Sequence, residues 1–201
     1  MARLQLNKSS LGQEAKNLRT YKRFLPSLDL KRQQLMAERA NAARTLIQTR
    51  ETIKAFRKRV GETLPMLAYE DVDLTGLVRI TRVEVTTENL VGTRLPTLQR
   101  VEVEVRDYAL LAKPHWVDRA AALLRDMLEL QVRLQVDQQR LAHLDDAVKT
   151  ITQRVNLFDK VLIPRTESNI KRIRIYLSDE QMAAVVRSKI AKRKRATVWS
   201  A

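Results

Sequence analysis

The sequence contains no cysteine and has few glycine, proline and aromatic residues. Among 201 residues there are four glycines and five prolines, and aromatic residues make up 4%. Without cysteine there is no disulfide framework, no thiolate nucleophile and no cysteine-ligated zinc site, which fits a reducing compartment. This composition disfavours a compact globule with many turns.

The motifs of common catalytic and membrane proteins are also missing. No apolar run approaches the roughly 20 residues of a membrane span, and the first residues lack a signal-peptide core, so we expect a soluble protein without direct membrane insertion. No phosphate loop of the GxxxxGK[ST] or GxGxxG kind occurs, so we expect no ATP hydrolysis by this chain and no cofactor.

The few candidates for acid–base or metal chemistry are poorly arranged. His115 and His143 are far apart in the sequence, without carboxylates at ligand spacing. Asp145 and Asp146 are adjacent on a predicted helix and point in different directions, so they do not form a paired acid and base. We therefore predict no catalytic residues and no metal site, and a protein that is not an enzyme.

The abundant features are positive charge and heptad periodicity. The formal net charge is +15, with basic ends and a slightly acidic middle, which predicts acidic partners for the ends. Heptads of apolar residues run from Leu18 to Val60 and from Ala120 to Leu162, a spacing typical of coiled coils. Because the two runs have equal lengths, we expect the two helices to pair with each other.

The stretch between the heptads changes to a two-residue period. Here apolar residues alternate with charged residues or threonine, which predicts a β-hairpin; we expect these residues to bind a partner: Val78, Ile80, Val83, Val85, Val101, Val103 and Val105. We predict a long hairpin loop through Asn89, Gly92 and Pro96, and a second long helix opened by Pro114. The predicted segments are a helix at 1–60, a middle segment at 61–119 and a second helix with a basic tip at 120–201.

The second heptad run ends in a motif of a known family. Its residues are Val155-Asn156, Leu157-Phe158-Asp159, Val161-Leu162-Ile163-Pro164-Arg165, Glu167 and Ile170-Lys171-Arg172-Ile173. The motif resembles the C-terminal signature V-N-A-L-E, then V-x-I-P-R-L-E-x-T-I-x-Y-I, of the D subunit of the rotary V-type and A-type ATPases. The departures are Leu157-Phe158-Asp159 for Ala-Leu-Glu, Thr166 for Leu, Asn169 for Thr and Arg172 for Tyr. Residues 7–35 are similar to the basic first helix of that family, and the resemblance covers 5–60 and 120–195.

The resemblance implies a fold and a set of partners. The implied fold is mainly α, a long antiparallel two-helix coiled coil formed by the N- and C-terminal segments, with a small middle segment that contains the hairpin. The implied role is a central rotor shaft that transmits torque between the catalytic A and B subunits and the membrane ring. The middle segment is expected to bind the F subunit and the subunit that caps the ring, and the complex is expected to be cytoplasmic and peripheral to a membrane.

The chain end is expected to rise into the hexamer of A and B subunits. Its basic residues are then expected to face acidic loops there, with a tryptophan against an apolar collar; the expected contact residues are Lys189, Lys192, Arg193, Lys194, Arg195 and Trp199. Two alternatives remain open on the residues alone. One is a basic coiled coil that binds nucleic acid through KIAKRKR, and the other is a stalk or chaperone of a secretion apparatus.

Two details of the helices are predicted from the residues. An interior proline usually breaks a lone helix, but we expect a paired helix to continue through Pro164, the alternative being an end at Ile163 and a restart; Pro26 presents the same choice. For the alignment of the two helices, we predict that Arg39 pairs with Asp137. The alternative alignment, shifted by a heptad, places each of these charges opposite a leucine or isoleucine.

Overall fold

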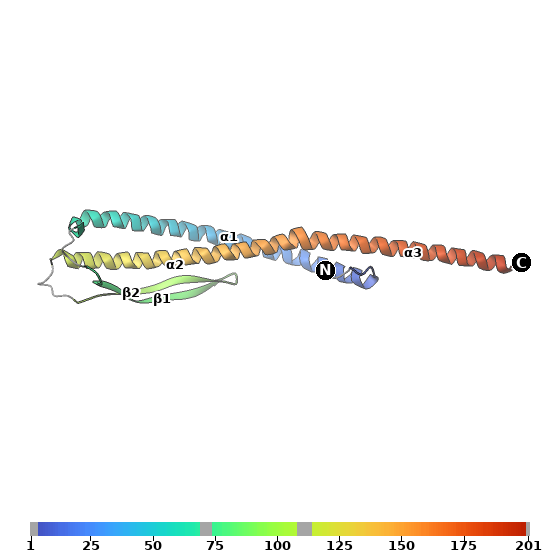
Figure 1. The fold of residues 1–201 in the computed structure, drawn as a ribbon, viewed down its shortest axis with the longest axis horizontal. Helices are drawn as coiled ribbons and strands as arrows, with labels where there is room; N and C mark the ends of the chain where they lie inside the picture. Colours follow the sequence, from blue (N-terminus) through green and yellow to red (C-terminus); the bar gives the residue numbers. More distant parts are fainter. Residues whose placement is uncertain (1–3, 69–73, 108–113, 200–201) are drawn as a thin grey trace. The chain divides into compact units, whose positions relative to one another are not determined.

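The computed structural model describes residues 4–68, 74–107 and 114–199, without the side chains of 67, 68 and 196–199. Its elements, in chain order, are α1 (Lys8–Thr63), the 3-10 turn η1 (Pro65–Ala68), β1 (Val78–Leu90), β2 (Thr93–Val105), α2 (Trp116–Asn156), the π-helical segment η2 (Leu157–Leu162) and α3 (Ile163–Trp199). Long helices at both ends and an antiparallel hairpin in the middle confirm the predicted fold class (Figure 1).

These elements divide into two compact units. One unit combines the chain up to Lys31 with the chain from Ile151, and the other is Arg32–Thr150. Each unit therefore contains a part of α1 together with a part of the second helical segment, and the hairpin belongs entirely to the unit 32–150. None of the described helices contains a stretch long and apolar enough to cross a bilayer.

Helix α1 starts at a polar cap and runs through its proline. The side-chain oxygen of Asn7 accepts a hydrogen bond from the Ser10 N–H at 2.7 Å, which satisfies a backbone donor of the first turn. Pro26 lies inside the helix, so the expectation of a continuous α1 is confirmed. Near the other end, the buried Leu64 packs with Ala120 and Leu123 of α2.

The buried residues of α1 form one stripe at heptad spacing. They are Leu35, Ala42, Leu46, Thr49 and Ile53, all predicted seam positions. Helix α2 contributes buried seam residues that include Ala120, Leu123 and Leu144. It also buries Val117, Ala121 and Val136, which lie off the predicted seam. Helix α2 therefore buries a second face, and Val117 and Ala121 on that face pack against Leu77 at the start of the hairpin.

The hairpin has longer strands and a shorter turn than predicted. Only Val91 and Gly92 connect the strands, with φ of 51° and 79°. The predicted long loop is wrong, because Asn89 pairs with Arg94 and Pro96 pairs with Thr87 inside the ladder. A two-residue turn with positive φ at both positions matches the natural twist of a hairpin, and a two-stranded sheet tolerates proline because each strand has an unpaired edge.

The start of α2 agrees with the expected role of Pro114. Helix α2 begins at Trp116, and the Val117 N–H donates a hydrogen bond to the Pro114 carbonyl at 3.0 Å. Val117 is fully buried in the cluster with Leu77 and Ala121. The first turn of α2 is thus held by packing against the start of the hairpin.

Replacing a buried seam residue should destabilise the helix pair strongly. Leu144 is 0% exposed, so Leu144→Ala should lower the free energy of unfolding by about 2–5 kcal/mol through lost burial and a residual cavity. The matched control is Ile47→Ala on α1, which is 54% exposed and should change it by less than about 0.5 kcal/mol. Urea unfolding followed by circular dichroism measures both, and equal effects would contradict the assigned seam.

Candidate functional site

Two polar contacts fix the alignment of α1 and α2 in the unit 32–150. The Arg39 guanidinium is paired with the Asp145 carboxylate. In the second contact, the hydroxyl of Thr49, a residue that is only 7% exposed, donates a hydrogen bond to Asp137 Oδ2 at 2.9 Å. From the first contact to the second, the residue number rises on α1, from Arg39 to Thr49, and falls on α2, from Asp145 to Asp137. The two helices are therefore antiparallel within this unit.

The predicted pair between Arg39 and Asp137 is wrong. Asp137 and Asp145 are two helical turns apart, about 12 Å along the axis, so the partner of Asp145 is not beside Asp137. The prediction assumed that the other alignment would bury both charges without partners. Instead, Asp137 binds the hydroxyl of Thr49, and Arg39 turns out of the seam with its side chain 53% exposed. Neither charge is therefore buried alone.

The signature residues surround a change of helix type. Between α2 and α3 the chain forms the π-helical turn of η2, and the Ile163 N–H donates to the carbonyl of Phe158, five residues earlier. Asn156 and Ile163, on either side of η2, both have right-handed helical φ and ψ. The expectation that the helix continues through Pro164 is confirmed, and it does not end at Ile163.

The π turn gives a physical reason for this continuity. It accommodates one residue more than an α turn, so the buried positions after it shift by one residue to Thr166, Ile170 and Ile173. Pro164 is the second residue of α3, directly after the wide turn. An ordinary α turn there would bring the proline ring against the carbonyl four residues earlier. The segment thus keeps its buried face on one side and tolerates the ring.

Several signature residues hold this part of the chain to the start of α1. Val155, Ile170 and Ile173 are buried. Glu167 forms a 2.7 Å ion pair with Lys22, and Phe158 makes an edge-to-face contact with Tyr21 at 5.5 Å between ring centroids. Asn169 donates to Glu14 at 3.3 Å. Exposed members of the signature, accessible for contacts outside this chain, include Asn156, Val161, Pro164 and Arg165.

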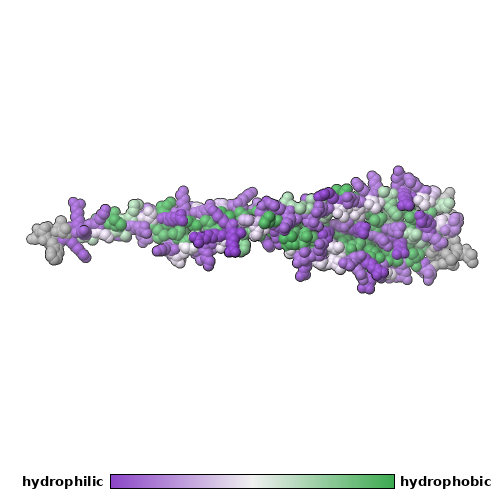
Figure 2. Space-filling model, turned by 180° about the vertical axis from the view of Figure 1, so that it is seen from behind, coloured by the Kyte–Doolittle hydropathy of each residue, from purple (hydrophilic) through white to green (hydrophobic). Residues whose placement is uncertain are grey.

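The C-terminal part of α3 buries none of its faces. Every residue from 178 to 195 is exposed, including the predicted contact residues Lys189, Lys192, Arg193, Lys194 and Arg195. Met182, Val185, Val186 and Ile190 are each at least half exposed among these charges. Figure 2 shows such hydrophobic patches interspersed with hydrophilic side chains on one face of the molecule. Trp199 is the last residue of α3, and its side chain lies outside the described part.

The predicted hairpin residues divide into half-buried and exposed positions. Direct cross-strand partners are Val78 with Val105, Ile80 with Val103 and Val83 with Val101. Irregularities between Ile80 and Arg82 and between Glu84 and Val85 interrupt the regular register. Val83, Val85 and Val105 are 39%, 46% and 38% exposed, so part of this apolar set faces solvent.

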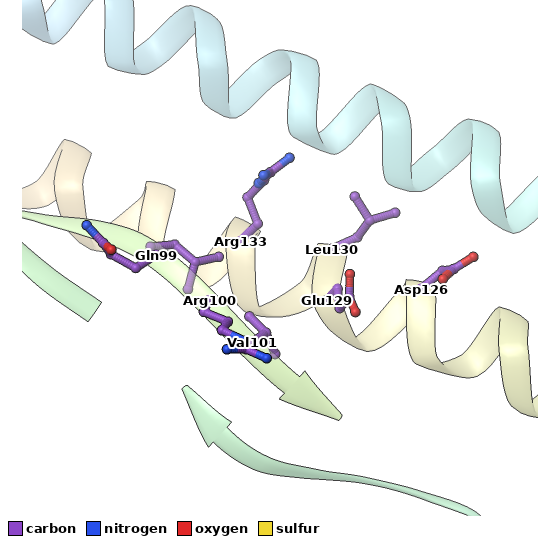
Figure 3. Close-up of a pocket in the computed structure, with 8 residues that line it drawn as sticks. Gln99, Arg100, Val101, Asp126, Glu129, Leu130 and Arg133 are labelled. Carbon is purple, nitrogen blue, oxygen red and sulfur yellow. The ribbon is translucent and has the colours of Figure 1, made fainter. Parts of the chain in front are cut away.

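A groove of about 490 Å³ lies between β2 and α2. It is lined on β2 by residues 98–101 and on α2 by Asp126, Glu129, Leu130 and Arg133. Figure 3 shows the strand passing along the helix at this point, with Leu130 and Arg133 directed toward α1. The groove mixes two acidic and two basic side chains, Asp126, Glu129, Arg100 and Arg133. Within the described residues no group of three or more histidine and acidic side chains could hold a metal ion.

Sequence reasoning missed a polar side chain that joins three elements of the unit 32–150. The Arg140 guanidinium binds Glu38 on α1, Glu88 on β1 and Thr97 on β2. Its position next to the seam indicates a contact with α1, but no periodicity indicates which hairpin residues lie beside it. Thr49 is a polar residue at a heptad position, and only the structure identifies it as the partner of Asp137.

The fold and these contacts define a class of protein. It is a protein of paired long helices with a central hairpin, in which the described contacts join helix to helix and hairpin to helix. A family model for the ATP synthase D subunit matches residues 10–193. The chain therefore belongs to the family of ATP synthase D subunits.

Curated relatives agree with this assignment. The chain is 32% identical to the V-type ATP synthase D subunit of Borreliella burgdorferi over 192 residues, which are 96% of this chain and 95% of the relative. It is 31% identical to that of Chlamydia trachomatis over 96% of both chains. It is 32% identical to that of Chlamydia abortus over 96% of this chain and 94% of the relative.

Disulfide trapping should distinguish the observed alignment from the predicted one. Cysteines replacing Thr49 and Asp137 should oxidise to a crosslink faster than cysteines replacing Arg39 and Asp137, because only the first pair is in contact. The natural chain has no cysteine, so each double variant contains a single possible bond. Non-reducing electrophoresis after proteolysis between the helices reads the crosslink. Faster crosslinking of the second pair would restore the predicted alignment.

The two helical prolines should differ in their cost. Pro26 lies within an ordinary α-helix, so Pro26→Ala should raise the free energy of unfolding by about 1–3 kcal/mol. Pro164 follows the π turn, so Pro164→Ala should change it by less than about 1 kcal/mol. Thermal and urea unfolding compare the two variants. A larger stabilisation at Pro164 than at Pro26 would mean that the π turn does not relieve the ring.

Proposed function

We propose that this chain is the central rotor shaft of a V/A-type ATPase or ATP synthase. In this role it transmits torque between the catalytic hexamer of A and B subunits and the membrane ring, and it catalyses no reaction itself. The observation that carries the proposal is the exposed, basic end of α3 in a member of this family. The relatives, which are named as D subunits of V-type ATP synthases, support the same complex.

The end of α3 has the properties expected of a segment that a partner surrounds. An isolated helix with no buried face gains little stability from its own chain, and most helices in proteins are stabilised by packing. Here the exposed apolar residues Met182, Val186 and Ile190 recur along the same length as the basic residues. A surrounding collar with apolar positions and acidic loops would bind both the exposed apolar residues and the basic residues. This supports insertion of the tip, Lys189–Arg195 together with Trp199, into the hexamer.

The helix pair has contacts suited to resisting relative sliding. Buried heptad residues resist separation of α1 and α2, and the polar pairs of Arg39 with Asp145 and Thr49 with Asp137 fit only one alignment. In the other unit, Lys22 with Glu167 and Glu14 with Asn169 act similarly. Torque applied to one helix is then carried by the other, which a shaft requires.

The hairpin is the proposed docking region for other central-stalk subunits. Its partly exposed valines, Val83, Val85 and Val105, offer an apolar face to the F subunit, and the acidic middle of the sequence suits a partner different from that of the basic tip. The subunit that caps the membrane ring is the second proposed partner there. In this arrangement the protein is cytoplasmic and is attached to the membrane only through the complex.

Reconstitution with A and B subunits tests the shaft function. The full chain should join the hexamer, whereas a chain truncated after Ile190 should bind at least about tenfold more weakly at low salt, because charge steering and tip contacts are lost. A full-length control with glutamine in place of the five basic tip residues separates charge from length. Its defect should shrink at high salt, where these charges are screened.

Two outcomes would contradict the proposal. One is hexamer affinity and coupled ATP turnover that are unchanged by the truncation at both salt concentrations. The other is retention of the full chain by nucleic acid and not by the hexamer, which would favour a basic coiled coil that binds nucleic acid.

A further inference from the structure

Arg140 joins three elements through one guanidinium. Its Nη1 donates to Glu88 Oε2 on β1 at 3.1 Å and to Thr97 Oγ1 on β2 at 2.9 Å. Its Nη2 donates to Glu38 Oε1 on α1 at 3.1 Å. The Arg140 side chain is 19% exposed, so these charge-assisted bonds lie in a partly shielded position, where they are stronger than surface pairs.

The hairpin is attached to the helices at two separate places. At its root, Leu77 packs with Val117 and Ala121 in an apolar cluster. Toward its tip, Arg140 holds Glu88 and Thr97, and Leu95, the cross-strand partner of Glu88, is fully buried. Between these attachments, a groove of about 490 Å³ is lined by residues 98–101 of β2 and by residues of α2 (Figure 3). The hairpin is thus held on the helices by an apolar cluster at its root and by polar contacts toward its tip.

The two nitrogens of the guanidinium have different partners, and this asymmetry determines which contact breaks more easily. Nη2 binds Glu38, whose side chain is 27% exposed, whereas Nη1 serves the hairpin through Glu88, which is 53% exposed. If the contacts of Arg140 with Glu88 and Thr97 break, Arg140 still keeps its carboxylate partner Glu38 on α1. Opening then leaves no unpaired charge in a shielded position, which is the large cost of breaking a buried ion pair.

We propose that Arg140 is the positioning residue of an ionic latch that holds the tip half of the hairpin on the helices. The latch consists of Arg140, Glu88 and Thr97. When it opens, the tip half lifts while the root stays anchored at Leu77, and Leu95 becomes exposed. The device concerns how the hairpin is held, so it is independent of whether the hairpin binds the F subunit.

The geometry makes different predictions for the two glutamates. Glu88→Gln removes the charged partner of Arg140 on the hairpin, and Arg140→Gln removes its ion pairs with both Glu88 and Glu38. Both substitutions should therefore raise the fraction of molecules in which the tip half of the hairpin is released from the helices. Glu38→Gln leaves the contacts of Arg140 to Glu88 and Thr97 intact, so the tip should stay docked. Arg140→Lys keeps the charge but not the planar fork, and should fall between the natural chain and Arg140→Gln.

Distance measurements between spin labels on the full chain test the latch. One label replaces Val91 at the hairpin turn and the other replaces the exposed His143 on α2; the absence of natural cysteine makes labelling specific. Arg140→Gln and Glu88→Gln should raise the ratio of released to docked tips about tenfold, the change expected for loss of one charge-assisted contact. Raising the salt concentration to about 0.5 M screens the ion pair, so it should move the natural chain in the same direction.

A second label pair, replacing Asp107 and Arg119 near the root, should report one distance in all variants. Circular dichroism should be unchanged in Glu88→Gln, which removes no contact between helices. An unchanged tip distance in Arg140→Gln and at high salt would overturn the latch. Release by Glu38→Gln as large as release by Glu88→Gln would also overturn it, because Arg140 would then be a general structural link.

Discussion

The requirement that α2 bury two faces at once determines the architecture of the unit 32–150. One face carries the heptad seam to α1, in which Leu35 and Leu144 are among the most buried residues. The other face carries Val117 and Ala121 beneath the root of the hairpin. If α2 had a single apolar stripe, the hairpin would have no apolar surface of the helix to pack against. A lone two-stranded hairpin is at best marginally stable in water. The second face of α2 therefore explains why a hairpin persists beside a coiled coil, and why the root of the hairpin is held by an apolar cluster.

Polar residues at the edges of the seam decide the alignment, because apolar heptads tolerate shifts of a whole heptad. Asp137 occupies a seam position, and its partner is a threonine hydroxyl, not a charge. Arg39 avoids burial by turning toward Asp145, with an exposed side chain. A long arginine side chain reaches out of a seam at small cost, whereas the short aspartate side chain needs a partner at its own level. The alignment of the two helices is thus determined by Asp137, whose short side chain needs a partner at its own level.

Much of this fold follows from the sequence, and the parts that do not follow have identifiable physical causes. Heptad spacing predicts the seam positions Leu35, Ala42, Leu46 and Ile53, because burial against one helix needs that period. The alternating valines predict both strands. The sequence does not indicate the turn at Val91 and Gly92, because valine is rare at positive φ, and Pro96 favours a loop over a strand. The three-way contact of Arg140 was missed because it joins residues that are distant in sequence and obey no common period.

The π turn connects the signature motif to the mechanics of the helix pair. A heptad seam that gains one extra residue would rotate all later residues by about 100°, which would turn Ile170 and Ile173 away from their buried side. Absorbing that residue in η2 preserves burial and also accommodates Pro164. The buried Thr166, in the first turn of α3, donates its hydroxyl hydrogen to the Leu162 carbonyl at 2.7 Å and so needs no partner from another helix. The signature therefore accommodates a shift of the heptad phase in the seam, and this structural role leaves exposed members such as Asn156, Val161 and Arg165 unexplained.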